Sequence, residues 1–249
     1  MGVHETARRG FAAAADVYEE SRPGYPAEAI DWLAGELGLR RGSTVVDLAA
    51  GTGKLTRLLI PTGAALIAVE PVEAMRRALR RTSPEADARD GTAERTGLPA
   101  SSADAVTVAQ AFHWFDAPRA LTEIHRVLRP AGRLALVWNI RDLEDPTQRA
   151  VDDLFAPYRG DTPSHRGARW RRALDDSELF ETTAKSHFPN VQTLDAASLV
   201  SRVASTSFIA DLPEPERRRV LERARAIASD LPDRFPFPYT TEVEVLARR

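Results

Sequence analysis

The sequence predicts an α/β fold in which helices cover both faces of a doubly wound, mostly parallel sheet. Two observations support this prediction. Short apolar segments alternate with segments of helical periodicity between residues 44 and 139. A chain of 249 residues is also the right size for a single domain, 1–249, with one sizeable core. Because such alternation implies right-handed crossovers, we expect a ligand at the carboxyl ends of the strands.

Two helices are predicted before the sheet begins. An alanine-rich segment near 6–20 has helical character, and the Pro- and Gly-containing segment 21–26 then enforces a loop. A second helix is expected over 27–37, because Ile30, Leu33 and Leu37 share one face and Gly38 follows.

The alternating part of the chain predicts five strands and three helices. Strands are expected near 44–48, 65–70, 86–89, 104–110 and 133–139, and helices near 53–60, 73–81 and 117–128. On the helix over 73–81 the apolar residues face the core. Its arginines, including Arg76, are therefore expected on a solvated face.

Residues beyond 139 predict a cap and two more strands. Segment 141–183 contains two helical patterns around the polar loop 159–167, which is long enough to belong to a lid. Four of its arginines are either solvated or able to receive an anionic substrate: Arg166, Arg169, Arg171 and Arg172. Strands are expected near 184–188 and 238–247, with Asp195 capping a short helix and Pro213 opening a longer one. The expected cap and lid elements cover about 8–26, 141–183 and 195–232.

Composition excludes several classes of protein. The formal net charge is -2, which argues against general electrostatic capture of nucleic acid. The chain has no cysteine, so we expect no disulfide and no thiolate metal site, and the sequence suggests no metal-ligating residues. No apolar run suggests secretion or a membrane span, and the default expectation is a cytoplasmic protein. The sequence does not fix the oligomeric state.

The segment after the first strand predicts a nucleotide-cofactor site. Asp47 ends the strand, and Gly51 and Gly53 form a turn that opens a helix. A phosphate-binding P-loop would need a glycine at Leu48, and a dinucleotide turn would need a small residue at Thr56. An anion at Asp47 would repel a pyrophosphate, whereas it suits the cationic S-adenosylmethionine. A carboxylate at Glu70, after the second strand, can accept ribose hydroxyls.

These motifs resemble the class I S-adenosylmethionine-dependent methyltransferases, in the small-molecule branch that includes ubiquinone-biosynthesis and trans-aconitate methyltransferases. The resemblance rests on Asp47-x-x-x-Gly51-x-Gly53, on Glu70, on the turn 90–94 and on His113-Trp114-Phe115. It implies a Rossmann-like sheet of seven strands. The implied cofactor-binding residues are Arg22, Asp47, Ala49, Gly51, Thr52, Gly53, Glu70, Pro71, Met75, Thr92, Ala93 and Gln110. The family usually has aspartate where this chain has Thr92.

The resemblance also implies a substrate pocket beside the cofactor, formed by Tyr18, Tyr25, His113 and Trp114. The expected reaction is methyl transfer to a small-molecule acceptor by in-line displacement. Because alignment can supply much of the rate, His113 is expected to be a pocket wall, with a catalytic base as the other reading. Two alternatives remain at this point. They are a non-catalytic S-adenosylmethionine-binding module and a nicotinamide-dependent oxidoreductase.

Overall fold

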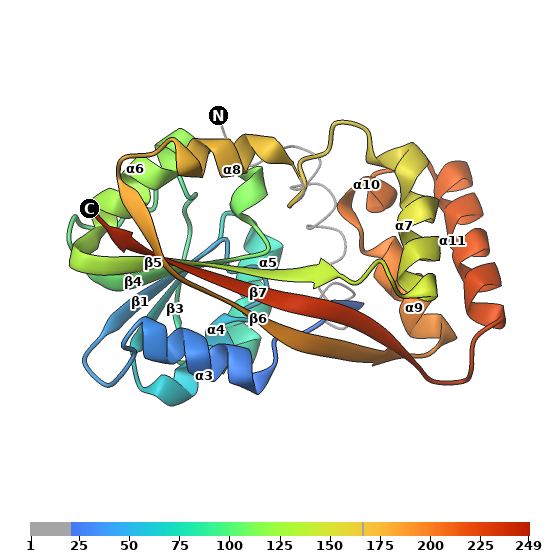
Figure 1. Ribbon diagram of the computed structural model, residues 1–249, viewed down its shortest axis with the longest axis horizontal. Helices are drawn as coiled ribbons and strands as arrows, with labels where there is room; N and C mark the ends of the chain where they lie inside the picture. The colour runs from blue at the N-terminus through green and yellow to red at the C-terminus, as the bar shows by residue number, and fades with distance from the viewer. Residues whose placement is uncertain (1–20, 166) are drawn as a thin grey trace.

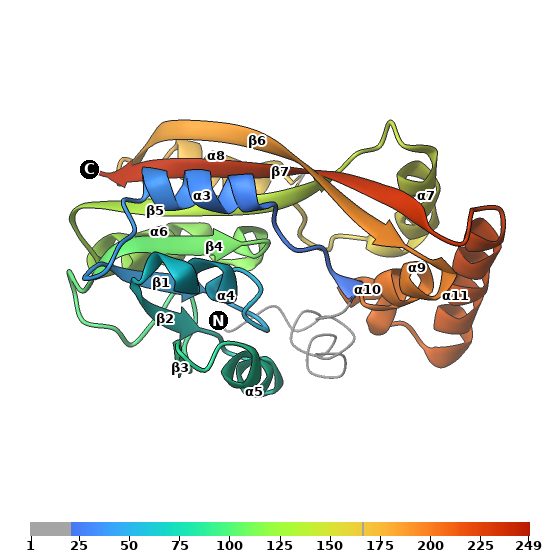
Figure 2. The ribbon, with the colours of Figure 1, turned by 90° about the horizontal axis from the view of Figure 1, so that it is seen from below.

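The computed structural model describes residues 21–165 and 167–249, and it confirms the predicted α/β class (Figures 1 and 2). A seven-stranded sheet has the order β3-β2-β1-β4-β5-β7-β6. The first five strands are parallel to their neighbours, whereas β7 runs antiparallel to both β5 and β6. The strands are β1 (Thr44–Leu48), β2 (Ala65–Val69), β3 (Asp87–Arg89), β4 (Ala103–Ala109), β5 (Leu128–Arg141), β6 (Phe180–Leu194) and β7 (Phe235–Arg248).

Helices connect the strands and form the cap. They are α3 (Ala27–Glu36), α4 (Thr56–Leu59), α5 (Glu73–Thr82), α6 (Ala117–Val127), α7 (Pro146–Arg159), α8 (Ala168–Asp175), α9 (Ala196–Ala204), α10 (Ser207–Ala210) and α11 (Glu214–Ser229), with 3-10 turns η1 (Ile60–Thr62) and η2 (Phe112–Trp114). The helix expected near 6–20 lies outside the described residues. None of the helices in the described ranges is long and apolar enough to cross a membrane.

A hydrophobic core lies on each face of the sheet. Val46 contributes to the core under α6 and α8, while its neighbour Val45 contributes to the core under α3 and α4. This alternation follows from the two-residue period of a strand. A third core joins α7, α9 and α11 to the far ends of the strands, around Phe155, Leu199 and Phe237. These helices form a separate lobe beyond the rest of the sheet, which we call the cap lobe (Figure 1).

Strands β5, β6 and β7 are all longer than the sequence predicts, and β5 covers Leu128–Arg141 where 133–139 was expected. Strands near 184–188 and 238–247 were expected, but β6 and β7 pair continuously from Phe180↔Arg248 to Leu194↔Phe235, with one irregularity. The reason is that β6 is an edge strand whose residues are mostly exposed or half-buried, so it carries little apolar pattern. The extra length carries the chain from the sheet into the cap lobe.

Two local predictions can be compared directly with the structure. The helix expected over 53–60 begins only at Thr56, because Gly51 and Gly53 both adopt left-handed φ angles of 59° and 84° that delay it. Asp195 caps α9 as expected, since its Oδ1 accepts a hydrogen bond of 2.8 Å from the backbone N–H of Ser198.

Candidate active site

A pocket of about 1030 Å³ opens at the carboxyl ends of β1, β2 and β4. This is the edge of a parallel sheet at which ligands bind in folds of this class. Ten of the residues predicted from the sequence line it: Ala49, Gly51, Glu70, Pro71, Met75, Thr92, Ala93, Gln110, His113 and Trp114. The pocket is at the upper end of the range for small-molecule sites, roughly 300–1,000 Å³.

The backbone is strained where two strands enter the pocket. Ala49, after β1, has a φ of 53°, and Gln110, after β4, has a φ of 59°. A left-handed conformation costs a residue other than glycine ~1–3 kcal/mol and is found preferentially at functional sites. Gln110 also has a buried Nε2 that has no hydrogen-bond partner within residues 21–165 and 167–249. The end of β4 therefore presents a donor that a ligand can satisfy.

The Glu70 carboxylate is fixed at the pocket wall by the backbone. Its Oε2 accepts from the N–H of Gly51 at 3.0 Å, and its Oε1 accepts from the N–H of Val72 at 2.9 Å. Burial raises the pKa of Glu70 to about 7, and the nearby charge of Asp47 adds to the rise, whereas the two hydrogen bonds and Arg76 oppose it. Each oxygen keeps acceptor capacity for a donor on a ligand.

Arg76 supports this carboxylate and corrects a prediction. The sequence placed Arg76 on a solvated face, but the residue is only 8% exposed. Its guanidinium donates to the backbone oxygen of Glu70 at 2.6 Å, to Asp90 at 2.7 Å and to Glu73 at 2.6 Å. Arg76 therefore ties the end of β2 to α5 and to the turn after β3.

Asp47 does not line the pocket, although the sequence placed it beside the ligand. It is 1% exposed, and its carboxylate accepts from the hydroxyls of Thr56 at 2.6 Å and Thr107 at 2.9 Å. Burial raises its pKa to about 6, against the lowering effect of these hydrogen bonds. Asp47 thus joins the start of α4 to β4 beneath the glycine turn.

Two other predicted residues of the turn also lie behind the pocket surface. The carbonyl of Thr52 accepts from the hydroxyl of Thr82 at 2.8 Å. At Gly53 an added Cβ would lie 3.0 Å from Ser83 Oγ and 3.1 Å from Leu79 Cγ, so glycine is needed for the turn to pack on α5. These residues shape the turn from the side opposite the pocket.

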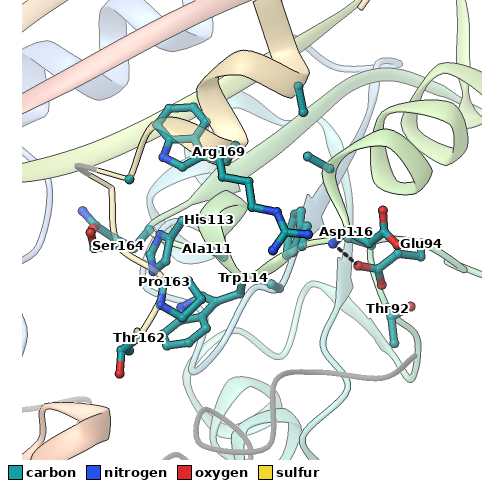
Figure 3. A pocket seen from close by; sticks show the side chains of 18 of the residues that line it. Thr92, Glu94, Ala111, His113, Trp114, Asp116, Thr162, Pro163, Ser164 and Arg169 are labelled. Carbon is teal, nitrogen blue, oxygen red and sulfur yellow. Dashed lines mark hydrogen bonds between the residues drawn. The ribbon is translucent and has the colours of Figure 1, made fainter. Parts of the chain in front are cut away.

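The turn after β3 forms a further wall of the pocket. Glu94 Oε1 accepts from the backbone N–H of Asp116 at 3.0 Å, which ties this turn to the start of α6 (Figure 3). Gly91 allows the close packing, because a Cβ there would lie 2.9 Å from Val69 Cγ1. Thr92 and Ala93 are thereby held at the pocket edge.

His113 and Trp114 lie on η2, facing the loop that precedes α8 (Figure 3). His113 Nδ1 is buried and has no hydrogen-bond partner in the part of the chain that the structure describes. Burial, with a smaller contribution from His165, lowers the pKa of His113 to about 3, so its imidazole is neutral at physiological pH. The His113 ring packs against Trp114 and Trp138, with centroid distances of 4.9 and 5.4 Å.

The polar loop that the sequence assigns to a lid forms the wall opposite these rings, although of the residues in this wall only Arg169 was singled out in advance. Thr162, Pro163 and Ser164 line the pocket together with Arg169 and Trp170 of α8. Arg169 reaches from α8 into the space between His113 and Asp116 (Figure 3). The length and polarity of the loop were the signals that placed it in a lid. No local motif indicates which residues of a long loop face a pocket.

Other predicted residues lie elsewhere. Arg22 donates to the carbonyl of Ser205 at 2.9 Å, and Tyr25 packs against the core under α3, so neither lines this pocket. Tyr18 and Arg166 lie outside the described residues. Arg171 forms a bidentate pair with Glu244, at 2.9 and 2.6 Å, and is therefore committed to the fold.

Comparison with known proteins identifies the family to which this chain belongs. Residues 46–136 match the family described as "Methyltransferase domain". An uncharacterised methyltransferase of Mycobacterium tuberculosis is 38% identical over 236 residues, which cover 93% of this chain and 92% of the relative. A methyltransferase-like protein of Schizosaccharomyces pombe is 37% identical over 216 residues, with 86% and 84% covered.

Solved structures agree on the fold. A proposed type II methyltransferase from Anaeromyxobacter dehalogenans has a TM-score of 0.67 at 24% identity, with 92% of this chain and 97% of that chain covered. Geranyl diphosphate methyltransferase in complex with S-adenosylmethionine has a TM-score of 0.52 at 18% identity, with 90% and 85% covered. The chain therefore belongs to the methyltransferase family and has the fold of the class I S-adenosylmethionine-dependent enzymes.

Proposed function

We propose that the protein transfers a methyl group from S-adenosylmethionine to a small-molecule acceptor in the pocket at the ends of β1, β2 and β4. The observation that carries this proposal is the Glu70 carboxylate. It lies at the pocket wall, each oxygen oriented by a backbone N–H and open to a further donor. That arrangement suits the two neighbouring hydroxyls of a ribose.

The remaining lining residues fit the other parts of the cofactor. Pro71, Val72 and Met75 give an apolar wall next to Glu70 that suits the adenine ring. Gln110 contributes the buried Nε2 donor at the end of β4. The proposed direct contacts of the glycine turn with the cofactor come from Ala49 and Gly51. The turn itself is held in shape by Asp47, Thr52 and Gly53, which do not line the pocket.

The chain's own contribution to the reaction is alignment and the exclusion of water. When bound, S-adenosylmethionine would supply the methyl group, transferred by in-line displacement with S-adenosylhomocysteine as the leaving group. His113, Trp114 and Trp170 surround the proposed acceptor space with rings and keep water out. Holding the reactants in line can contribute roughly 7–11 kcal/mol, so a dedicated base is not required.

His113→Gln tests whether His113 acts only as a wall. A residue whose pKa is held at about 3 is a weak base, so we expect the rate to fall less than about tenfold and the pH–rate profile to keep its shape. The assay follows transfer of the labelled methyl group to the acceptor between pH 5.5 and 8.5. A loss of about a hundredfold or more, with unchanged cofactor affinity, would contradict the wall role.

The affinity for S-adenosylhomocysteine should depend on pH through Glu70. The pKa of about 7 means that Glu70 is mostly ionised at pH 8 and mostly protonated at pH 6, and only the ionised form offers both oxygens as acceptors. Binding at pH 6 must therefore first remove a proton. Calorimetry should give affinity about tenfold weaker at pH 6 than at pH 8. Glu70→Gln should abolish the difference, and a constant affinity in the unmodified protein would refute the assignment.

Hydrogen exchange tests the proposed lid. The loop 160–165 and α8 line the pocket but lie outside the parallel strands, so ligand contacts should slow their exchange. We expect S-adenosylhomocysteine to protect this segment, with α11, which contributes no residue to the pocket, as the internal reference. The lid proposal also includes 8–26, of which residues 8–20 lie outside the described part of the chain. Equal exchange with and without ligand throughout these segments would exclude a lid.

Transfer of labelled methyl groups tests the proposed function as a whole. The purified protein and methyl-labelled S-adenosylmethionine are incubated with a metabolite extract, and mass spectrometry identifies every labelled compound. A labelled small molecule is the expected product. Label found only in protein or nucleic acid would contradict the proposal, and cofactor binding with no transfer would support the binding-module alternative.

A further inference from the structure

Three arginines from distant parts of the chain meet where β5 enters the cap lobe. Arg141 is the last residue of β5, Arg202 lies in the last turn of α9, and Arg22 precedes α3. Arg22 reaches the carbonyl of Ser205, one residue after α9 ends. We call these three residues the cap arginine cluster. None of them lines the pocket described above.

Among the described residues, the side-chain contacts of Arg141 and Arg202 include a single carboxylate, that of Asp152. Arg141 Nη1 lies 3.4 Å from Asp152 Oδ1, but the same oxygen accepts a shorter bond of 2.8 Å from Arg159. Arg202 is 5% exposed, and its Nε donates to the neutral hydroxyl of Tyr239 at 3.3 Å. Among the described residues, Arg202 Nη1 is buried and has no hydrogen-bond partner. Within the described part of the chain, Arg202 therefore has no carboxylate partner.

Burying the Arg202 guanidinium in this way lowers the stability of the fold unless an anion binds to it. Burying a cation without a partner costs several kcal/mol, and removing water also leaves its unpaired N–H group unsatisfied. The arginines also act on one another. Burial lowers the pKa of Arg141 to about 9, and the charges of Arg202 and Arg22 contribute to this lowering. The guanidinium of Arg141 is further held over the Phe155 ring, 4.7 Å from its centroid.

The cluster lies on the ligand side of the sheet. β5 runs parallel to β4, and the N–H of Gln110 at the pocket donates to the carbonyl of Val137 on β5. Arg141 follows Val137 by four residues, which is ~13 Å further along an extended strand. An acceptor that reaches from the methyl position toward the cap lobe can therefore place a charged group at Arg141.

We propose that Arg141 and Arg202 bind an oxyanion of the methyl acceptor, a carboxylate or a phosphate, between the end of β5 and α9. This inference rests on the proposed function. Guanidinium groups match both oxyanions through paired N–H donors, and Arg202 Nη1 is a donor that such a group would satisfy. Arg141 and Arg202 then determine specificity, because a neutral analogue would leave the buried Nη1 of Arg202 without a partner among the described residues.

Thermal unfolding of the full chain with saturating S-adenosylhomocysteine tests the proposal. Sodium phosphate, disodium glutarate and sodium chloride are compared at equal ionic strength and pH. Phosphate, glutarate or both should raise Tm above the chloride value, by about 3–6 °C at ten times the dissociation constant. Arg202→Gln and Arg141→Gln should each abolish the rise, whereas Arg225→Gln, on the exposed surface of α11, should keep it.

The outcomes separate the possible anions. A response to phosphate alone assigns a phosphate ester as the acceptor, and a response to glutarate alone assigns a carboxylic acid. If neither salt exceeds chloride in the unmodified protein, the inference is wrong. It is also wrong if the salts act only without S-adenosylhomocysteine, because the cluster would then hold the cofactor's own carboxylate. The Tm shift caused by S-adenosylhomocysteine alone is measured first, so failure of cofactor binding is recognised separately.

Discussion

Glu70→Ala is expected to weaken the binding of both S-adenosylmethionine and S-adenosylhomocysteine by at least tenfold. The variant removes a charged acceptor from the proposed ribose site and leaves the N–H groups of Gly51 and Val72 without their partner. Losing a hydrogen bond to a charged group costs about 1.5–3 kcal/mol, and each 1.4 kcal/mol changes affinity about tenfold. Calorimetry with each ligand measures the change.

A matched control for Glu70→Ala is Glu85→Ala, in the connection between α5 and β3. Glu85 is exposed and follows α5 without a contact to the pocket, so Glu85→Ala should bind both ligands with unchanged affinity. Circular dichroism of both variants checks that the sheet is intact. If Glu70→Ala and Glu85→Ala bind equally well, Glu70 does not hold the ribose.

Trp138→Ala is expected to lower the free energy of unfolding by about 3–5 kcal/mol, because it removes a large, fully buried ring. Trp138 is 1% exposed, and its ring lies 5.3 Å from that of Trp170 and 4.6 Å from that of His165. It therefore joins β5 to α8 and to the loop that lines the pocket. Urea unfolding followed by circular dichroism measures the effect.

Trp32→Ala is the comparison for this substitution. Trp32 is half-buried on α3, and its ring centroid lies 6.0 Å from that of Phe188. Trp32→Ala should therefore lower the free energy of unfolding clearly less than Trp138→Ala. Equal losses for the two variants would show that the contacts between β5 and α8 contribute little to stability.

The sequence predicts the central strands well because a short local run of apolar residues is enough to indicate that each strand is buried. The segments that become β1, β2 and β4 are short, apolar and bounded by turn residues, and the structure places all three within one or two residues of expectation. β6 is different. It is exposed along most of its length and owes its extent to pairing with β7, about fifty residues later. Such pairing leaves little trace in local hydrophobicity.

The site residues likewise divide into those that local sequence and topology place and those that depend on long-range contacts. Ala49, Gly51 and Glu70 follow strand ends, so topology alone brings them to one pocket. Asp47 lies one residue inside a strand end, and its direction depends on Thr107 of β4, sixty positions away. The cap arginine cluster depends on three separate segments and has no motif. The sequence drew attention instead to the arginines near α8, of which Arg171 is paired with Glu244.

A crystal structure of the protein with S-adenosylhomocysteine tests the central claim most directly. The claim predicts ligand density in the pocket at the ends of β1, β2 and β4, with both ribose hydroxyls within hydrogen-bond distance of the Glu70 carboxylate. It also predicts that the adenine ring lies against Pro71, Val72 and Met75. Density elsewhere in the molecule, or a ribose that does not touch Glu70, would contradict the account.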